Sequence, residues 1–289
     1  MRRWTAGATY RQKQFAEVVG SALGGPLPED IELAYPWLGF DVVEDVYEER
    51  TNQDRIERTE DVLLGLRAGG RIGYAAESLG SDRDALMVSA YAQNGWDFGR
   101  ERSMFVTTAA TGRVENDGLR MACCRPEPGT TRVPRTTRSS SRQVNGVVTD
   151  ELDADQQLLL GGEEGLRGYP LRYQAGTSRA LLTLEERYYT GWYPFRLFHV
   201  AGAAFFDMGR TWGTDVTGAT SDGWLKDVGI GLRLGSSRSA FGNVIHIDLA
   251  FPLDGGDAST ACSSSSGQRS ASRNRDVKIG DAHLFFCNR

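Results

Sequence analysis

Polar and apolar residues alternate along the C-terminal half of the chain with the period of two that is typical of β-strands. Within residues 244–251 every second residue is large and apolar, namely Ile245, Ile247, Leu249 and Phe251. Similar alternation predicts strands over residues 180–189, 198–212, 227–235 and 243–253. Upstream, strands are expected over residues 38–48, 62–74, 85–93 and 104–114, which polar loops separate. The pattern predicts an antiparallel meander.

Charged residues occupy the second face of several of these strands. Glu185 and Arg187 alternate with Leu182 and Leu184, and Arg233 lies between Leu232 and Leu234. Asp248 is placed in the same way between apolar neighbours. Such charges are costly to bury in the core of a soluble β-sandwich, whereas a hydrated lumen accommodates them. The alternation therefore favours a transmembrane β-barrel, and a mean hydropathy of −0.40 agrees with one because only alternate strand positions contact lipid.

An aromatic cluster follows the strand predicted over 180–189. It contains Tyr188, Tyr189, Trp192, Tyr193, Phe195 and Phe198. Two interpretations have equal weight from the sequence: an aromatic girdle at a membrane interface, or an aromatic hairpin packed in a soluble core.

Composition and motifs exclude several classes of function. A net charge of −5 and a pI near 5.4 argue against nucleic-acid binding, which requires clustered excess Lys and Arg. The three histidines, His199, His246 and His283, are isolated from one another, and no nucleophile motif accompanies them. Neither zinc-ligand spacing nor a phosphate-binding loop is present. We therefore expect no enzyme activity, no metal and no cofactor.

Two segments depart from the strand pattern. Residues 121–142 and 258–275 are rich in Arg and Ser, and all four cysteines lie in these segments or after the second one. The simplest interpretation is disordered loop, and a shifted reading frame of GC-rich DNA is a sharper hypothesis. We expect a partial barrel over residues 1–257, irregular within 121–142, and a disordered or out-of-frame tail over 258–289. The N-terminus has no signal-peptide pattern.

Candidate chemistry is concentrated in a glycine-rich segment before the strand predicted over 180–189. Residues 158–176 predict a long loop that folds back on itself, and they contain Leu166-Arg167-Gly168-Tyr169. Forty residues later the chain reads Phe205-Phe206-Asp207-Met208-Gly209. A guanidinium held away from bulk water needs a carboxylate partner, because an unpaired buried charge costs several kcal/mol. The two motifs indicate a buried ion pair.

With these motifs in this order, the chain resembles the outer-membrane assembly and two-partner secretion barrels, that is, BamA/TamA-type bacterial surface antigens. In that superfamily a long extracellular loop enters the barrel lumen, and the arginine at its tip pairs with the aspartate of a Phe-x-Asp-x-Gly motif. The resemblance covers about residues 144–254. It implies a site made of the loop tip, a Glu-x-Arg strand and the aspartate strand: Arg167, Gly168, Tyr169, Glu185, Arg187, Phe205, Asp207 and Gly209.

The resemblance also implies a fold, a location and partners. The fold is all-β, an antiparallel transmembrane barrel of which about 10–11 strands of a roughly sixteen-stranded parent are present, with five strands after the loop. The location is the outer membrane of a Gram-negative bacterium. The partners are outer-membrane lipid, unfolded or secreted polypeptide clients, and the periplasmic POTRA domains of the full-length parent. The alternatives are a passive pore or adhesin-like barrel, and a soluble β-sandwich binding module.

Overall fold

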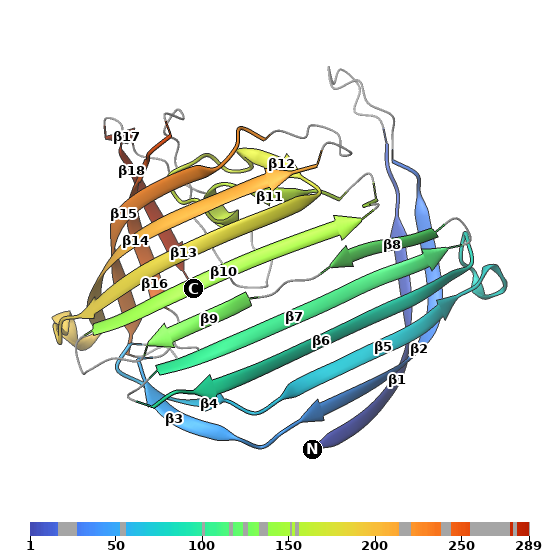
Figure 1. Cartoon of the computed structure of the whole chain (residues 1–289), viewed down its shortest axis with the longest axis horizontal. Coiled ribbons are helices and arrows are strands. Elements are labelled where there is room, and N and C mark those ends of the chain that lie inside the picture. Colours follow the sequence, from blue (N-terminus) through green and yellow to red (C-terminus); the bar gives the residue numbers. More distant parts are fainter. Residues whose placement is uncertain are drawn as a thin grey trace.

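The computed structural model describes residues 1–16, 28–52, 56–99, 102–115, 118–123, 127–132, 138–150, 152–153, 156–213, 221–237, 244–254, 278–279 and 282–288. Its main feature is one antiparallel sheet of 14 strands, in the order β1-β2-β5-β6-β7-β8-β10-β13-β14-β15-β16-β18-β17, with β9 paired to β7 and β10. Figure 1 shows these strands side by side in a strongly curved sheet. The all-β, antiparallel barrel fold predicted from the sequence is confirmed.

The strands before the long loop form one wall of the barrel. This wall consists of β1 (Arg2–Lys13), β2 (Ile31–Val43), β5 (Arg67–Ala75), β6 (Ala85–Asp97), β7 (Arg102–Glu115), β8 (Gly118–Cys123), β9 (Glu127–Arg132) and β10 (Arg138–Asp150). The strands β8 and β9 together occupy one place, because each pairs with a different half of β7.

The strands after the long loop form the other wall. They are β13 (Ser178–Tyr189), β14 (Phe198–Trp212), β15 (Leu225–Ser236), β16 (Val244–Pro252), β17 (Lys278–Ile279) and β18 (Ala282–Asn288). Two short two-stranded ladders stand apart from the main sheet: β3 (Tyr47–Thr51) with β4 (Thr59–Leu63), and β11 (Leu158–Leu160) with β12 (Gln174–Gly176). The 3₁₀ turns are η1 (Glu77–Leu79), η2 (Gly162–Glu164) and η3 (Pro194–Arg196). No helix in the described part of the chain is long and apolar enough to cross a membrane.

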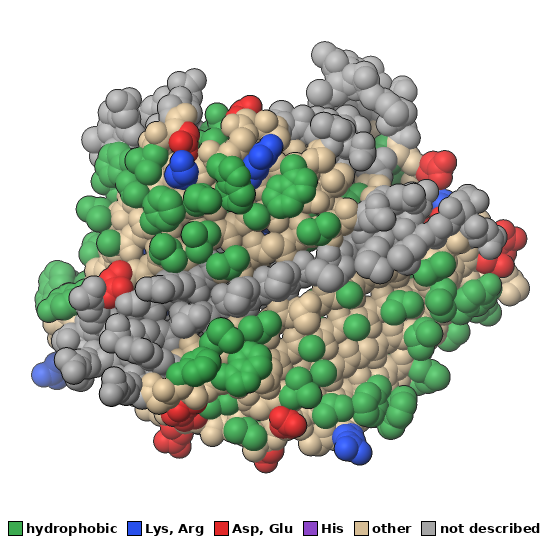
Figure 2. All heavy atoms as spheres, in the orientation of Figure 1, with side chains coloured by type: hydrophobic (Ala, Val, Ile, Leu, Met, Phe, Trp, Pro, Cys, Tyr) green, Lys and Arg blue, Asp and Glu red, His purple; other side chains and the backbone are tan. Residues whose placement is uncertain are grey.

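The strand register separates an apolar outer face from a polar inner face. On the outer face, Leu38 pairs with Ile72, and Ile72 pairs with Val88; these side chains are 60%, 53% and 41% exposed. On the second wall Ile230 and Leu232 face outward and are similarly exposed. Figure 2 shows hydrophobic side chains spread over this face, with most acidic and basic side chains near its margins. Such a band suits contact with lipid chains.

The aromatic cluster after β13 is mostly exposed. Tyr188, Trp192 and Phe195 have 57%, 63% and 88% of their surface accessible, whereas Tyr189 is buried on the inner face. Packing of the whole cluster in a soluble core, one of the two interpretations above, is therefore wrong. The exposed members fit an interfacial girdle.

The sheet has more strands than the 10 or 11 expected, for two reasons. First, the strand β1 was not expected. Second, strands form in segments for which the sequence predicted irregular or disordered structure. The described residues of 121–142 include parts of β8, β9 and β10, and β18 pairs with β16 as the fifth strand of the main sheet's path after the loop. A β-ladder joins backbone groups, so neighbouring strands can order a segment with an unfavourable composition.

The domain division at residue 257 and the frame-shift hypothesis stay predictions, and residues 258–277 lie outside the described residues.

The β3–β4 hairpin joins β2 to β5 and reaches across to the second wall. Ile56 is 4% exposed and packs in one apolar cluster with Tyr189 and Val244. The Arg58 guanidinium donates to the carbonyl oxygen of Ser237 at 3.0 Å. Tyr189 ends β13, whereas the long loop leads into the beginning of that strand. The hairpin and the long loop therefore approach opposite ends of the same wall.

Candidate functional site

The long loop between β10 and β13 is shaped by its own short ladder and by glycines. The β11–β12 ladder closes the loop at its base, and β11 and β12 lie against β14. Gly161 and Gly165 have φ values of 115° and 94°, which side chains with a Cβ rarely adopt. A Cβ on Gly165 would also lie 2.3 Å from Leu181 Cδ2 on β13. The glycines therefore let the loop turn sharply while it packs against the inner face.

The arginine at the loop tip contacts carboxylates from three strands. Arg167 Nε and Nη2 donate to the two carboxylate oxygens of Asp207 at 2.8 and 3.1 Å, a bidentate arrangement. Its Nη1 donates to Glu185 Oε2 at 3.0 Å and to Asp248 Oδ2 at 3.2 Å. The guanidinium carbon lies 3.4 Å from the ring centroid of Phe205, where the ring face attracts a cation. The loop tip is thus tied to β13, β14 and β16.

Two arginines of the sheet complete this cluster. Arg233 on β15 is fully buried, and it donates to Glu185 Oε2 at 2.9 Å and to Asp248 Oδ1. Arg187 Nε donates to Glu185 Oε1 at 2.6 Å. We call the resulting set the loop-tip network: Arg167, Arg187 and Arg233 with Glu185, Asp207 and Asp248. The three positive and three negative charges of these six residues cancel one another.

The two residues after Arg167 fix the depth at which the loop sits. The backbone N–H of Gly168 donates to Asp227 Oδ2 at 2.9 Å, and a Cβ at Gly168 would lie 2.7 Å from the Asp227 Cβ. Tyr169 is fully buried, packs with Leu225, and donates its hydroxyl to the carbonyl oxygen of Lys226 at 3.1 Å. Burial raises the pKa of Tyr169 to about 12, so this phenol remains a hydrogen-bond donor at neutral pH.

Of the eight residues inferred from the motifs, the structure brings six together around the loop tip. The other two, Arg187 and Gly209, lie farther from it. Arg187 donates to Glu185, which also accepts from Arg167. Gly209 faces the loop base, where a Cβ would lie 3.1 Å from Leu160 Cδ2.

Sequence reasoning missed Asp227, Arg233 and Asp248 as members of the site. A signal for two of them was present, since Arg233 and Asp248 are charges on the inner side of otherwise apolar strands. Asp227 had no such motif, and its role follows from the register that places it directly opposite Asp207. Their contribution extends the site to every strand from β13 to β16.

The arrangement can hold a loop in place, and it offers no evident reaction chemistry. Among the described residues, no group of three or more His, Cys, Asp and Glu side chains is arranged to hold a metal ion. All carboxylates of the loop-tip network bond to arginines. The hydrogen bonds of Arg167 connect the tip of the long loop to the barrel wall.

Comparison with known proteins agrees with this geometry. The family model of the Omp85 superfamily domain matches residues 64–262, which include the loop and strands β13 to β16. No curated protein matches the chain. The family consists of outer-membrane barrels of Gram-negative bacteria that assemble or secrete other proteins. Since the match covers more than half of the sequence and the sheet is a partial barrel, the chain belongs to the Omp85 superfamily.

Proposed function

We propose that this chain is the barrel part of an outer-membrane protein that inserts, assembles or translocates other polypeptides, and that its long loop must stay bound in the lumen for this activity. One observation carries the proposal: Arg167 joins the loop tip to carboxylates on three strands, while Arg233 links two of those carboxylates from a fourth. Such a connection couples the position of the loop to the shape of the wall.

The coupling gives the loop a mechanical role. A buried ion pair that loses one partner leaves an uncompensated charge, which costs about 3–5 kcal/mol. The loop therefore has one strongly preferred seat, and the four strands that supply the network keep a fixed register around it. A wall with a fixed strand register keeps its shape while a client binds to the barrel.

We place the client at the seam between the first and last strands of the complete barrel, of which this chain supplies a part. An unpaired strand edge offers backbone N–H and C=O groups, on which an extended segment can add as a further strand. The partners are then unfolded or secreted polypeptides, outer-membrane lipid and the POTRA domains of a longer parent.

The proposal is tested with Arg167→Ala in protein refolded into lipid vesicles. The activity measured is the rate at which a urea-denatured barrel client folds into those vesicles. The variant should lose at least tenfold of the acceleration, because the loop leaves its seat. Arg172→Ala is the matched control, since Arg172 lies in the same loop and is exposed; it should fold clients at the wild-type rate.

Two results would count against the proposal. Wild-type acceleration in Arg167→Ala would show that the seat of the loop is irrelevant to activity. A refolded wild-type protein that conducts ions but never accelerates client folding would instead identify a passive pore.

A further inference from the structure

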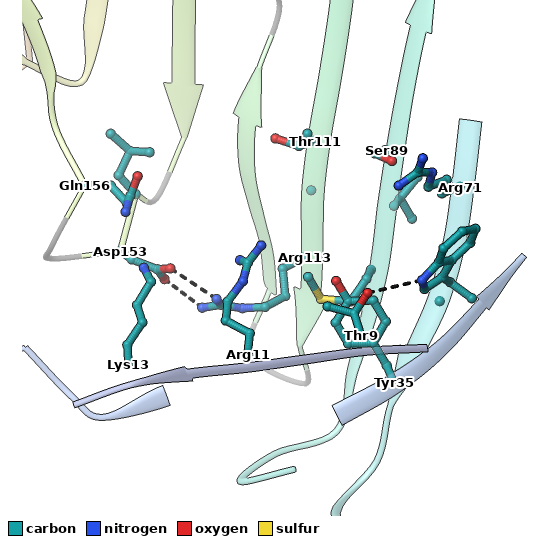
Figure 3. A pocket seen from close by; sticks show the side chains of 16 residues that line it. Thr9, Arg11, Lys13, Tyr35, Arg71, Ser89, Thr111, Arg113, Asp153 and Gln156 are labelled. Atoms are coloured by element: carbon teal, nitrogen blue, oxygen red, sulfur yellow. Dashed lines mark hydrogen bonds and ion pairs between the residues drawn. The ribbon is translucent and has the colours of Figure 1, made fainter. Parts of the chain in front are cut away.

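A cavity of about 550 Å³ lies on the inner face of the first wall, away from the loop-tip network. It is lined by residues of β1, β2, β5, β6 and β7, and by residues 152, 153 and 156 at the start of the long loop. Figure 3 shows Arg11 and Lys13 on β1 turned toward the same space as Arg71 and Arg113 on the opposite strands. The volume is that of a ligand pocket rather than of a single ion.

The cavity has an excess of positive charge. Four of its lining residues are Arg or Lys, and the only carboxylate among them is Asp153. Asp153 is engaged by Arg113, whose Nη1 and Nη2 donate to its two oxygens at 3.1 and 2.7 Å. Glu115, beyond the lining, lies 2.5 Å from Arg113 Nε. The carboxylates at this end of the cavity are therefore matched to Arg113 rather than to the arginines farther along the wall.

The remaining arginines are held where a ligand can reach them. Arg71 lies over the ring of Trp37, with 4.6 Å between its Cζ and the ring centroid, and Trp37 Nε1 donates to Thr9 Oγ1 at 3.1 Å. The Asp41 carboxylate on β2 attracts Arg71 electrostatically, but its two oxygens accept hydrogen bonds from Arg3 and Tyr91. Arg11 and Arg71 are both exposed, and within the described residues neither forms an ion pair with a carboxylate. A stacked guanidinium keeps its planar N–H fork available for an acceptor.

Hydroxyl groups extend the polar lining between these cations. Ser89 lies directly opposite Arg71, and Thr111 lies directly opposite Ser89, so the three side chains form one row on the inner face. A row of alternating donors along neighbouring strands suits an extended ligand that carries several acceptors. Single phosphate or chloride ions would leave most of the cavity to water.

We propose that this cavity binds an acidic stretch of the client polypeptide as it passes the first wall of the lumen, with Arg11 and Arg71 as the main carboxylate-binding groups. The inference rests on the proposed function, since it assigns a binding site to the same client. The location on the inner face favours a peptide over a lipid headgroup, because the outer face carries the apolar band.

The test measures binding of hexaglutamate, labelled with an uncharged fluorophore, to the full chain refolded in detergent micelles. Fluorescence anisotropy should report saturable binding that weakens with added salt. The double variant Arg11→Gln/Arg71→Gln should bind at least tenfold more weakly, because two charge-assisted contacts are lost. The matched control Arg2→Gln/Arg196→Gln has the same net charge, changes two exposed arginines outside the cavity, and should bind as the wild type does.

Further arms separate the possible failures. Ser89→Glu leaves both arginines in place but supplies a competing carboxylate beside Arg71, so it should also weaken binding; this variant serves if the double variant does not fold. Equal binding of hexaglutamate to the wild type and to both cavity variants would overturn the proposal. So would displacement of the peptide by equimolar inorganic phosphate, which would identify a small-anion site. If the double variant loses peptide binding but still accelerates client folding at the wild-type rate, clients do not use this cavity, and the proposed function stands without it.

Discussion

The two walls of the barrel treat their inner charges in opposite ways. On the wall from β13 to β16, three arginines bond to Glu185, Asp207 and Asp248, and a fourth inner carboxylate, Asp227, accepts a hydrogen bond from the backbone N–H of Gly168. On the wall from β1 to β7, Arg11 and Arg71 line a cavity whose one carboxylate is paired with Arg113. A balanced network stabilises the protein itself, whereas unmatched charges beside an open volume remain available to a ligand. The charges of the wall from β13 to β16 therefore hold the long loop in place, whereas those of the wall from β1 to β7 are placed to bind a ligand.

The largest loss of stability is expected when a charge is removed from the wall from β13 to β16. Arg233→Met replaces a fully buried guanidinium with an apolar side chain of similar length and leaves Glu185 and Asp248 with an uncompensated negative charge. The variant should lose about 3–5 kcal/mol of unfolding free energy. Urea unfolding in micelles, followed by tryptophan fluorescence, measures the loss. Arg196→Met, at an exposed turn, is the control, and equal stability of the two variants would contradict the assigned role.

A smaller effect is expected from crowding the loop seat without changing any charge. Gly168→Ala brings a methyl group to within 2.7 Å of the Asp227 Cβ, so the loop must shift. We expect a loss of about 1–3 kcal/mol in unfolding free energy, together with faster proteolysis of the loop. Gly202→Ala provides the matched control, because a Cβ there meets no atom within 4 Å. If both alanine variants behave alike, close packing at the loop tip is not what positions the loop.

The smallest effect on stability is expected from removing the cavity arginines of the wall from β1 to β7. Arg11→Gln/Arg71→Gln removes two exposed charges that pair with no described carboxylate, so unfolding free energy should change by less than about 1 kcal/mol. The same urea titration measures this change beside Arg233→Met. A loss comparable to that of Arg233→Met would mean that both walls use their arginines structurally, and the contrast between them would disappear.

Sequence patterns predicted the second wall better than the first. In the first wall the strands expected over 85–93 and 104–114 lie within β6 and β7, but those expected over 38–48 and 62–74 run across the breaks between β2 and β3 and between β4 and β5. The strand expected over 198–212 has the bounds of β14, and the strand expected over 243–253 differs from β16 by one residue at each end. Apolar residues in these strands are large and regularly spaced. The strand β1 escaped prediction because its outward residues include two alanines, and polar residues surround them. The strands β8 and β9 lie in or beside a segment rich in Arg, Pro and Ser, and β18 lies in the tail expected to be disordered or out of frame, so their pairing with neighbouring strands was not expected.

The sequence by itself determined which side chains share a face, since alternation along a strand is a local property of extended backbone. It also determined the order of the loop arginine, the Glu-x-Arg strand and the aspartate strand, which was enough to expect a pair between Arg167 and Asp207. Only the tertiary structure decided that Arg233 and Asp248 join that pair and that Arg11 and Arg71 meet across a cavity. These meetings depend on strand register, and a shift of one residue would turn each of these side chains to the opposite face.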